Sequence, residues 1–207
     1  MSSSAYRRVA APREGTRSRG VIASAAIGST AFVAVLWLSE FVDTLVGNRL
    51  DGLGIRPRTE DGLVGILWAP LLHGGWGHLL ANSLPVLVLG FIILCTGLQR
   101  WLLVTAIVWL LGGLGTWLTG GGGSIHIGAS GLVFGWFTYV ISVGFFTRRT
   151  GQIALGITLF LVYGGMLWGV LPGRPGTSWQ GHLFGALAGI LAAWLVGRRE
   201  PRQAWIR

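Results

Sequence analysis

The sequence predicts an all-α membrane protein, built as a bundle of six transmembrane helices. The chain of 207 residues is 52% hydrophobic and only 11% charged, whereas soluble domains carry about 25% charged residues. Its apolar residues form runs whose length is close to the ~20 residues that an α-helix needs to cross ~30 Å of hydrocarbon. It also contains 35 glycines and 11 tryptophans, which is typical of packed transmembrane helices and of membrane interfaces.

The six expected spans follow one another along the chain. Their ranges are 21–46, 76–98, 101–118, 127–146, 153–171 and 179–196. Together they form one core over residues 21–197. On either side we expect a disordered cytoplasmic N-terminal tail over residues 1–20 and a cytoplasmic C-terminal tail over residues 198–207, both rich in arginine.

Two connections have unusual compositions. The first outer loop, residues 47–75, ends in the mainly apolar stretch 63–72, which we interpret as an interfacial segment lying against the bilayer. The connection 119–126 contains four successive glycines. Non-helical backbone at membrane depth requires burial in protein or a water-filled cavity. We therefore expect this connection to dip inward and to recess the start of the fourth span.

The arginines predict the orientation, because cytoplasmic loops carry an excess of positive charge. All sixteen basic residues are Arg. One side collects twelve: Arg7, Arg8, Arg13, Arg17, Arg19, Arg100, Arg148, Arg149, Arg198, Arg199, Arg202 and Arg207. The other side has four: Arg49, Arg56, Arg58 and Arg174. Both termini are thus predicted to be cytoplasmic. Because no nucleic-acid motif accompanies the arginines, we expect contact with membrane lipids and not with nucleic acid.

This topology brings polar residues to one depth, since the second, fourth and sixth spans all begin on the outer side. The first two turns of these spans contain His78, Asn82, Ser130 and His182. Polar groups in lipid are costly and usually functional. Their common depth therefore predicts a site near the outer face.

Ser130 is the candidate nucleophile of this site. It lies between Gly128 and Gly131 at the head of a span, where free backbone N–H groups can stabilise an oxyanion. A serine hydroxyl needs a base to accept its proton, and His182 at matching depth is the candidate. A small-residue packing motif also explains the tetrapeptide around Ser130, but His182 favours a Ser-His dyad.

Glycines predict how two helices bring this pair together. Gly181, Gly185 and Gly189 recur every four residues on one face, and Gly131 and Gly135 follow Ser130. Two such faces permit a close helix crossing.

His78 and Asn82 share a helix face at the spacing i, i+4. We interpret them as donors aimed at an oxyanion, with interhelical hydrogen bonding as the alternative. His73 falls on another face and is interpreted as structural. A metal site formed by His73, His78, His126 and His182 is less favoured, because no carboxylate or thiolate accompanies them. The site spans also lack Asp and Glu, which favours a dyad over a triad.

Taken together, these motifs resemble the rhomboid family of intramembrane serine proteases over residues 21–197. The resemblance is carried by the histidine and asparagine of His78-Leu-Leu-Ala-Asn82, by Gly128-Ala129-Ser130-Gly131, by His182 with Gly185 and Gly189, and by the stretch 73–78.

The resemblance implies a bacterial-type, six-span protease that hydrolyses transmembrane substrates without a cofactor or metal. Ser130 would be the nucleophile and His182 the general base. The Ser130 N–H, His78 and Asn82 would bind the oxyanion beside Gly128, and Gly131, Phe134, Gly185 and Gly189 would support the packing. Substrates would carry small or helix-breaking residues, and the protein would reside in the cell membrane.

Two positions depart from the family pattern. Many members carry a Trp-Arg pair in the first outer loop, where this chain has Trp68 followed by Ala69 and Pro70. Many carry a tyrosine packed on the histidine, where this chain has Phe134. Two other functions stay open: an inactive rhomboid-like protein that binds membrane clients, and a small transporter using Glu40 and Asp43.

Overall fold

The structure is a computed structural model that describes residues 14–173 and 176–199. Within these residues, six helical segments are long and apolar enough to cross a membrane. They are α1 (Glu14–Leu45), α3 (Trp76–Leu94), α4 (Leu98–Thr119), α5 (Ser130–Thr147), α6 (Thr150–Tyr163) extended by the 3₁₀ turns of η3 (Gly164–Val170), and α7 (Trp179–Arg199). The predicted all-α bundle of a multi-pass membrane protein is thereby confirmed.

Several helix ends differ from the predicted spans by three residues or more. α3 ends at Leu94 and not at residue 98, α4 begins at Leu98, α6 begins at Thr150, and α7 continues to Arg199, two residues into the predicted C-terminal tail. α1 begins at Glu14 and not at residue 21, so residues 14–20 of the predicted disordered tail are helical. They contain no proline that would interrupt the helical hydrogen bonds. α5 begins at Ser130 and not at residue 127, and the fifth span ends in η3. Residues 1–13 and 200–207 of the predicted tails, and Arg174, lie outside the described residues.

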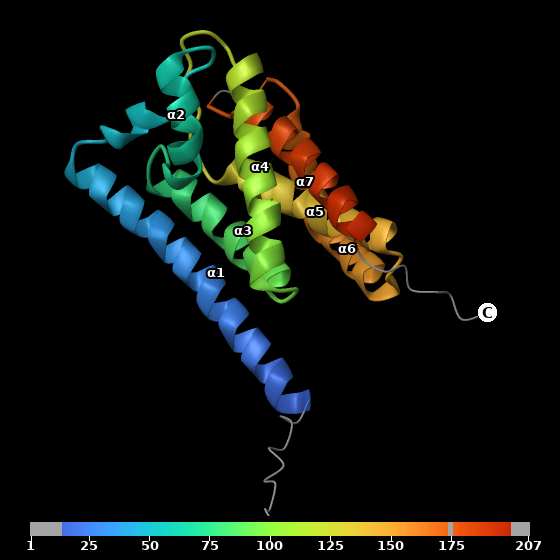
Figure 1. The fold of residues 1–207 in the computed structure, drawn as a ribbon. Helices are drawn as coiled ribbons and strands as arrows, with labels where there is room; N and C mark the ends of the chain where they lie inside the picture. Colours follow the sequence, from blue (N-terminus) through green and yellow to red (C-terminus); the bar gives the residue numbers. More distant parts are fainter. Residues whose placement is uncertain (1–13, 174–175, 200–207) are drawn as a thin grey trace, which may run out of the picture.

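α5 is the central helix of the bundle and packs against α3, α4, α6 and α7. Large side chains on α5 fill the core, with Trp136 and Phe137 fully buried. α1 lies at one edge and packs mainly along α3 (Figure 1). The N-terminal end of α1 and the C-terminal end of α7 point to the lower side in Figure 1, whereas α2 and the α4–α5 connection lie at the upper side.

The crossing of α5 and α7 depends on the glycines that the sequence places on both helices. A Cβ atom at Gly185 would overlap the carbonyl oxygen of Gly131, and one at Gly189 would overlap that of Gly135. The hydroxyl of Thr138 then donates to the Ala186 carbonyl at 2.7 Å. The two backbones therefore touch directly, as the glycine pattern predicts.

The first loop folds over the upper end of α4. It contains η1 (Leu50–Leu53), α2 (Glu60–Trp68) and η2 (Ala69–Leu71). Trp109 of α4 donates its ring N–H to the Ile66 carbonyl at 2.8 Å, and Trp117 donates to the Thr59 carbonyl at 2.8 Å. The opposite face of α2 exposes Leu63, Val64, Leu67 and Trp68. An apolar outward face is the pattern we expect of a helix at the bilayer interface.

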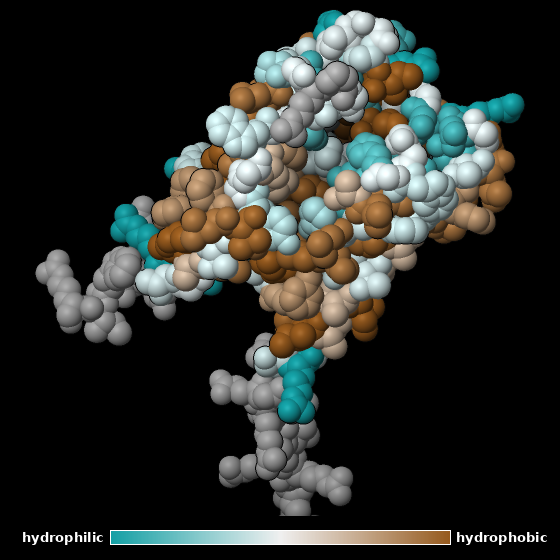
Figure 2. Space-filling model, turned by 180° about the vertical axis from the view of Figure 1, so that it is seen from behind, coloured by the Kyte–Doolittle hydropathy of each residue, from teal (hydrophilic) through white to brown (hydrophobic). Residues whose placement is uncertain are grey.

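The α4–α5 connection turns inward after an exposed glycine tip. His126 and Ile55 exchange two backbone hydrogen bonds, of 3.0 and 2.9 Å. The Gly128 N–H donates to the Ala69 carbonyl at 2.8 Å. The start of α5 is therefore tied to the first loop and lies below it. Figure 2 shows a broad apolar band across the middle of the rear face, with hydrophilic residues gathered toward its upper end.

Gly185→Ala tests the contact between α5 and α7. The added methyl group would overlap the Gly131 carbonyl oxygen, so the helices must separate, at a cost of about 1–3 kcal/mol in unfolding free energy. We expect a lower midpoint of thermal denaturation in detergent micelles. Gly151→Ala is the matched control, because nothing lies within 4 Å of a Cβ atom there. Equal midpoints for Gly185→Ala and the wild type would contradict the close crossing.

Candidate active site

The structure brings Ser130 and His182 together. Ser130 is the first residue of α5, and His182 lies in the first turn of α7. The Oγ atom of Ser130 and the Nε2 atom of His182 are 2.9 Å apart. The contact between Gly131, which follows Ser130, and Gly185, one turn after His182, permits this distance.

Two groups fix the His182 ring. Its Nδ1 atom lies 2.9 Å from the carbonyl oxygen of Gly169. Because a carbonyl can only accept, Nδ1 carries the proton and Nε2 is left to accept from Ser130. Phe134 stacks on the ring, with centroids 4.1 Å apart and planes at 6°. A Cβ atom at Gly169 would lie 2.8 Å from the Phe134 ring and 3.1 Å from Nδ1, so only glycine fits this position without displacement.

His78 and Asn82 line the same cleft as Ser130. The Gly74 N–H donates to Nδ1 of His78 at 3.3 Å, so the proton of the neutral ring resides on Nε2. Gly128 has φ of +116°, and a Cβ atom there would lie 2.6 Å from the His78 ring. The Asn82 amide nitrogen donates one hydrogen to the His78 carbonyl at 2.9 Å. Its second hydrogen remains for another acceptor.

His73, interpreted from the sequence as structural, lies buried beside His78 and Ala129. His73 lies before the first residue of α3, so the helix-face argument used for His78 does not apply to it. Its buried ring lies edge-on to that of His78, with centroids 5.2 Å apart. Its Nε2 atom accepts from the Ala129 N–H at 3.3 Å. Burial, aided by His78, lowers the pKa of His73 to about 4. A neutral His73 therefore holds the residue that precedes Ser130.

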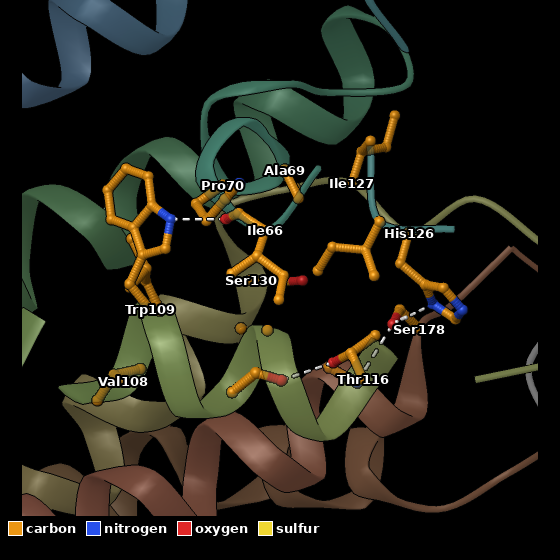
Figure 3. A pocket seen from close by; sticks show the side chains of 17 residues that line it. Ile66, Ala69, Pro70, Val108, Trp109, Thr116, His126, Ile127, Ser130 and Ser178 are labelled. Atoms are coloured by element: carbon orange, nitrogen blue, oxygen red, sulfur yellow. Dashed lines mark hydrogen bonds between the residues drawn. The ribbon is translucent and has the colours of Figure 1, made fainter. Parts of the chain in front are cut away.

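Two hollows meet at Ser130. An open cleft of about 660 Å³ is lined by His78, Asn82, Ser130 and His182, among others. A narrower pocket of about 50 Å³ lies on the other side of Ser130, between α2, η2 and α4 (Figure 3). Figure 3 shows the Ser130 side chain between Ile66, Ala69 and Pro70 on one side and α4 on the other. The Ser130 hydroxyl is accessible from a polar cleft and adjoins a small apolar pocket.

The arrangement suits nucleophilic acyl transfer. A serine hydroxyl is activated by a hydrogen-bonded imidazole, which a third group orients. Backbone N–H groups at the start of α5, which has no side-chain N-cap, lie beside the hydroxyl and can stabilise an oxyanion. Among the described residues, no group of three or more His, Cys, Asp or Glu side chains is placed to hold a metal ion.

A multi-pass membrane protein with a serine–histidine pair at its helix ends is the class that this geometry defines. A family model, the rhomboid domain, matches residues 60–199. The chain belongs to the rhomboid family, and its six-helix bundle is of rhomboid type.

Several curated proteins are similar to the chain. "Uncharacterized protein Rv1337" of Mycobacterium tuberculosis is 50% identical over 194 residues, which cover 90% of this chain and 80% of that protein. "Uncharacterized protein ML1171" of Mycobacterium leprae is 49% identical, covering 83% and 71%. A Bacillus subtilis protein with the name "Putative rhomboid protease YdcA" is 31% identical, covering 64% and 67%.

His73→Gln tests the buried neutral histidine. His73 has a pKa of about 4 in the folded protein, below its ordinary value of 6.5. As pH falls below 6.5 the unfolded chain takes up this proton first, so the unfolding free energy decreases until about pH 4. Glutamine keeps an acceptor for the Ala129 N–H but does not titrate. Between pH 7.5 and pH 5, the midpoint of thermal denaturation should therefore fall less for His73→Gln than for the wild type. Equal decreases in the two proteins would contradict the assignment.

Proposed function

We propose that the protein is an intramembrane serine endopeptidase, which cleaves peptide bonds in or near transmembrane segments of other membrane proteins. The observation that carries this proposal is the 2.9 Å contact between Ser130 Oγ and His182 Nε2, in a chain of the rhomboid family. The name of the Bacillus subtilis relative also describes a protease.

In the proposed reaction, Ser130 attacks the substrate carbonyl while its proton passes to Nε2 of His182. The imidazolium that forms keeps its Nδ1–H bonded to the Gly169 carbonyl and then gives the other proton to the leaving amine. Water from the open cleft attacks the acyl-enzyme, with His182 again acting as base, and Ser130 is regenerated. The Gly169 carbonyl thus takes the orienting role that a carboxylate has in a Ser-His-Asp triad.

The oxyanion of the tetrahedral intermediate would be bound on the side of His78 and Asn82. The Nε2–H of His78 and the second amide hydrogen of Asn82 are the side-chain donors available there. The Ser130 backbone N–H at the start of α5 is the third donor. These groups are fixed before the substrate binds, which is what electrostatic stabilisation of a transition state requires.

The small volume of the pocket beside Ser130 favours substrates with small side chains at the cleaved bond. Helix-breaking residues would help because a helical peptide has to unwind before its carbonyl reaches Ser130. The excess of arginine at one side supports cytoplasmic termini and a site near the outer face of the cell membrane.

Ser130→Ala is the direct test of the nucleophile. We expect loss of cleavage of a labelled transmembrane substrate by at least ~10³-fold, because removing a catalytic serine leaves only the residual rate from binding and the oxyanion site. A fluorophosphonate should label the wild type at Ser130, as identified by peptide mapping. Thr158→Ala is the matched control, since its hydroxyl bonds only within α6. Wild-type protein that binds the substrate but neither cleaves it nor reacts would indicate a client-binding protein.

Asn82→Ala tests the oxyanion site. Loss of one donor should lower kcat by about 10–1000-fold, with a smaller change in KM. Asn82→Asp keeps the shape of the side chain but removes its donors, so we expect a comparable loss. Cleavage at the wild-type rate by either variant would show that Asn82 does not donate to the oxyanion and only bonds to the His78 carbonyl.

A further inference from the structure

The cleft contains a second serine–histidine contact that the proposed reaction does not use. His126 Nδ1 lies 2.7 Å from the Oγ atom of Ser178, and Figure 3 shows this bond at the edge of the pocket. His126 is four residues before Ser130, and Ser178 is four residues before His182. The contact therefore joins the two segments that carry the dyad, four residues before Ser130 in one and four residues before His182 in the other.

The hydrogen bonds around this pair have one consistent direction. Ser124 donates its hydroxyl hydrogen to the Gly121 carbonyl at 2.7 Å, so it accepts from Nε2–H of His126 at 2.8 Å. Nδ1 of His126 is then an acceptor for the Ser178 hydroxyl. The Ser178 oxygen in turn accepts from the Gly181 N–H at 3.2 Å.

Both partners are anchored on their own side. His126 is 9% exposed, and its backbone pairs with Ile55 in both directions. Ser178 caps the start of α7 through Gly181, and its carbonyl accepts from the His182 N–H at 3.1 Å. A displacement of either residue would therefore be passed to its neighbour in the dyad.

The close contact between α5 and α7 reaches the site but begins only at Gly131 and Gly181. A Cβ atom at Gly185 would overlap the Gly131 carbonyl oxygen, and one at Gly131 would lie 3.3 Å from the Gly181 carbonyl oxygen. The segments that precede these glycines are joined by the hydrogen bond between His126 and Ser178.

We propose that His126 and Ser178 are a positioning pair, whose hydrogen bond holds the loop before Ser130 against the first turn of α7 and so sets the Ser130–His182 distance. This inference rests on the proposed function, since it assigns the pair a role in that reaction. Ser178 acts through His182 and is not itself a nucleophile, because its oxygen already accepts from Gly181 while its hydrogen is bonded to His126.

The test is a double-mutant cycle on the purified full chain. His126→Phe keeps a ring of similar size but removes both nitrogens, and Ser178→Ala removes the hydroxyl. We expect each to lower the rate constant of Ser130 labelling by a fluorophosphonate about tenfold or more, with the double variant no slower than the slower single variant. With a transmembrane substrate, kcat should fall while KM is retained. Ser178→Thr keeps the hydroxyl and should restore both rates.

A role limited to capping α7 gives a different pattern. In that case Ser178→Ala alone would be slow and His126→Phe would react like the wild type, which overturns the inference. Independent, multiplying effects of the two substitutions would also overturn it, as would fluorophosphonate found on Ser178. Thr158→Ala, on the far part of α6, should change none of these rates.

Amide hydrogen exchange separates this inference from the proposed function. His126→Phe should accelerate exchange in residues 126–130 and 178–182, and Thr158→Ala should not. If the wild type is inert but exchange accelerates in this way, the proposed function fails and the link between the two segments stands. If exchange in His126→Phe equals that of the wild type, the positioning pair is refuted whatever the activity.

Discussion

The direct backbone contact between α5 and α7 is the constraint on which the rest of the structure depends. Carbonyl oxygens of Gly131 and Gly135 occupy the space where Cβ atoms of Gly185 and Gly189 would lie. Only because of this approach can a short serine side chain on one helix reach an imidazole on another. Interhelical contact in lipid relies on such packing, since apolar burial alone does not favour helix association there.

Backbone groups, more than side chains, complete the site around this pair. The Gly169 carbonyl orients His182, and the Gly74 N–H orients His78. The Ala129 N–H is held by His73, and the Gly128 N–H by the Ala69 carbonyl. The first loop and the α4–α5 connection are therefore parts of the site's framework. Their hydrogen bonds to each other fix the place where α5 starts.

The sequence was sufficient to predict six spans, the meeting of the polar residues at one end of the bundle and the glycine crossing. Hydrophobic length and glycine spacing are local properties, and alternating topology places His78, Ser130 and His182 at one end. The start of α1 at Glu14 was not predicted, because residues 14–20 are mostly polar and such a composition does not indicate a helix. The bonds of His73, His126 and Ser178 were also missed. Serine three residues before Gly181 is a helix-capping signal, but loop conformation decides which histidine it meets.

The acceptor for Nδ1 of His182 is a peptide carbonyl, which any amino acid at position 169 would supply. No codon change can delete a main-chain oxygen, so replacing Gly169 adds bulk against Phe134 while the acceptor itself persists. The group that orients the His182 ring is thus protected from point mutation and would escape any alanine scan. A backbone ester introduced by chemical synthesis, which weakens that oxygen as an acceptor, would reveal its share in the chemistry.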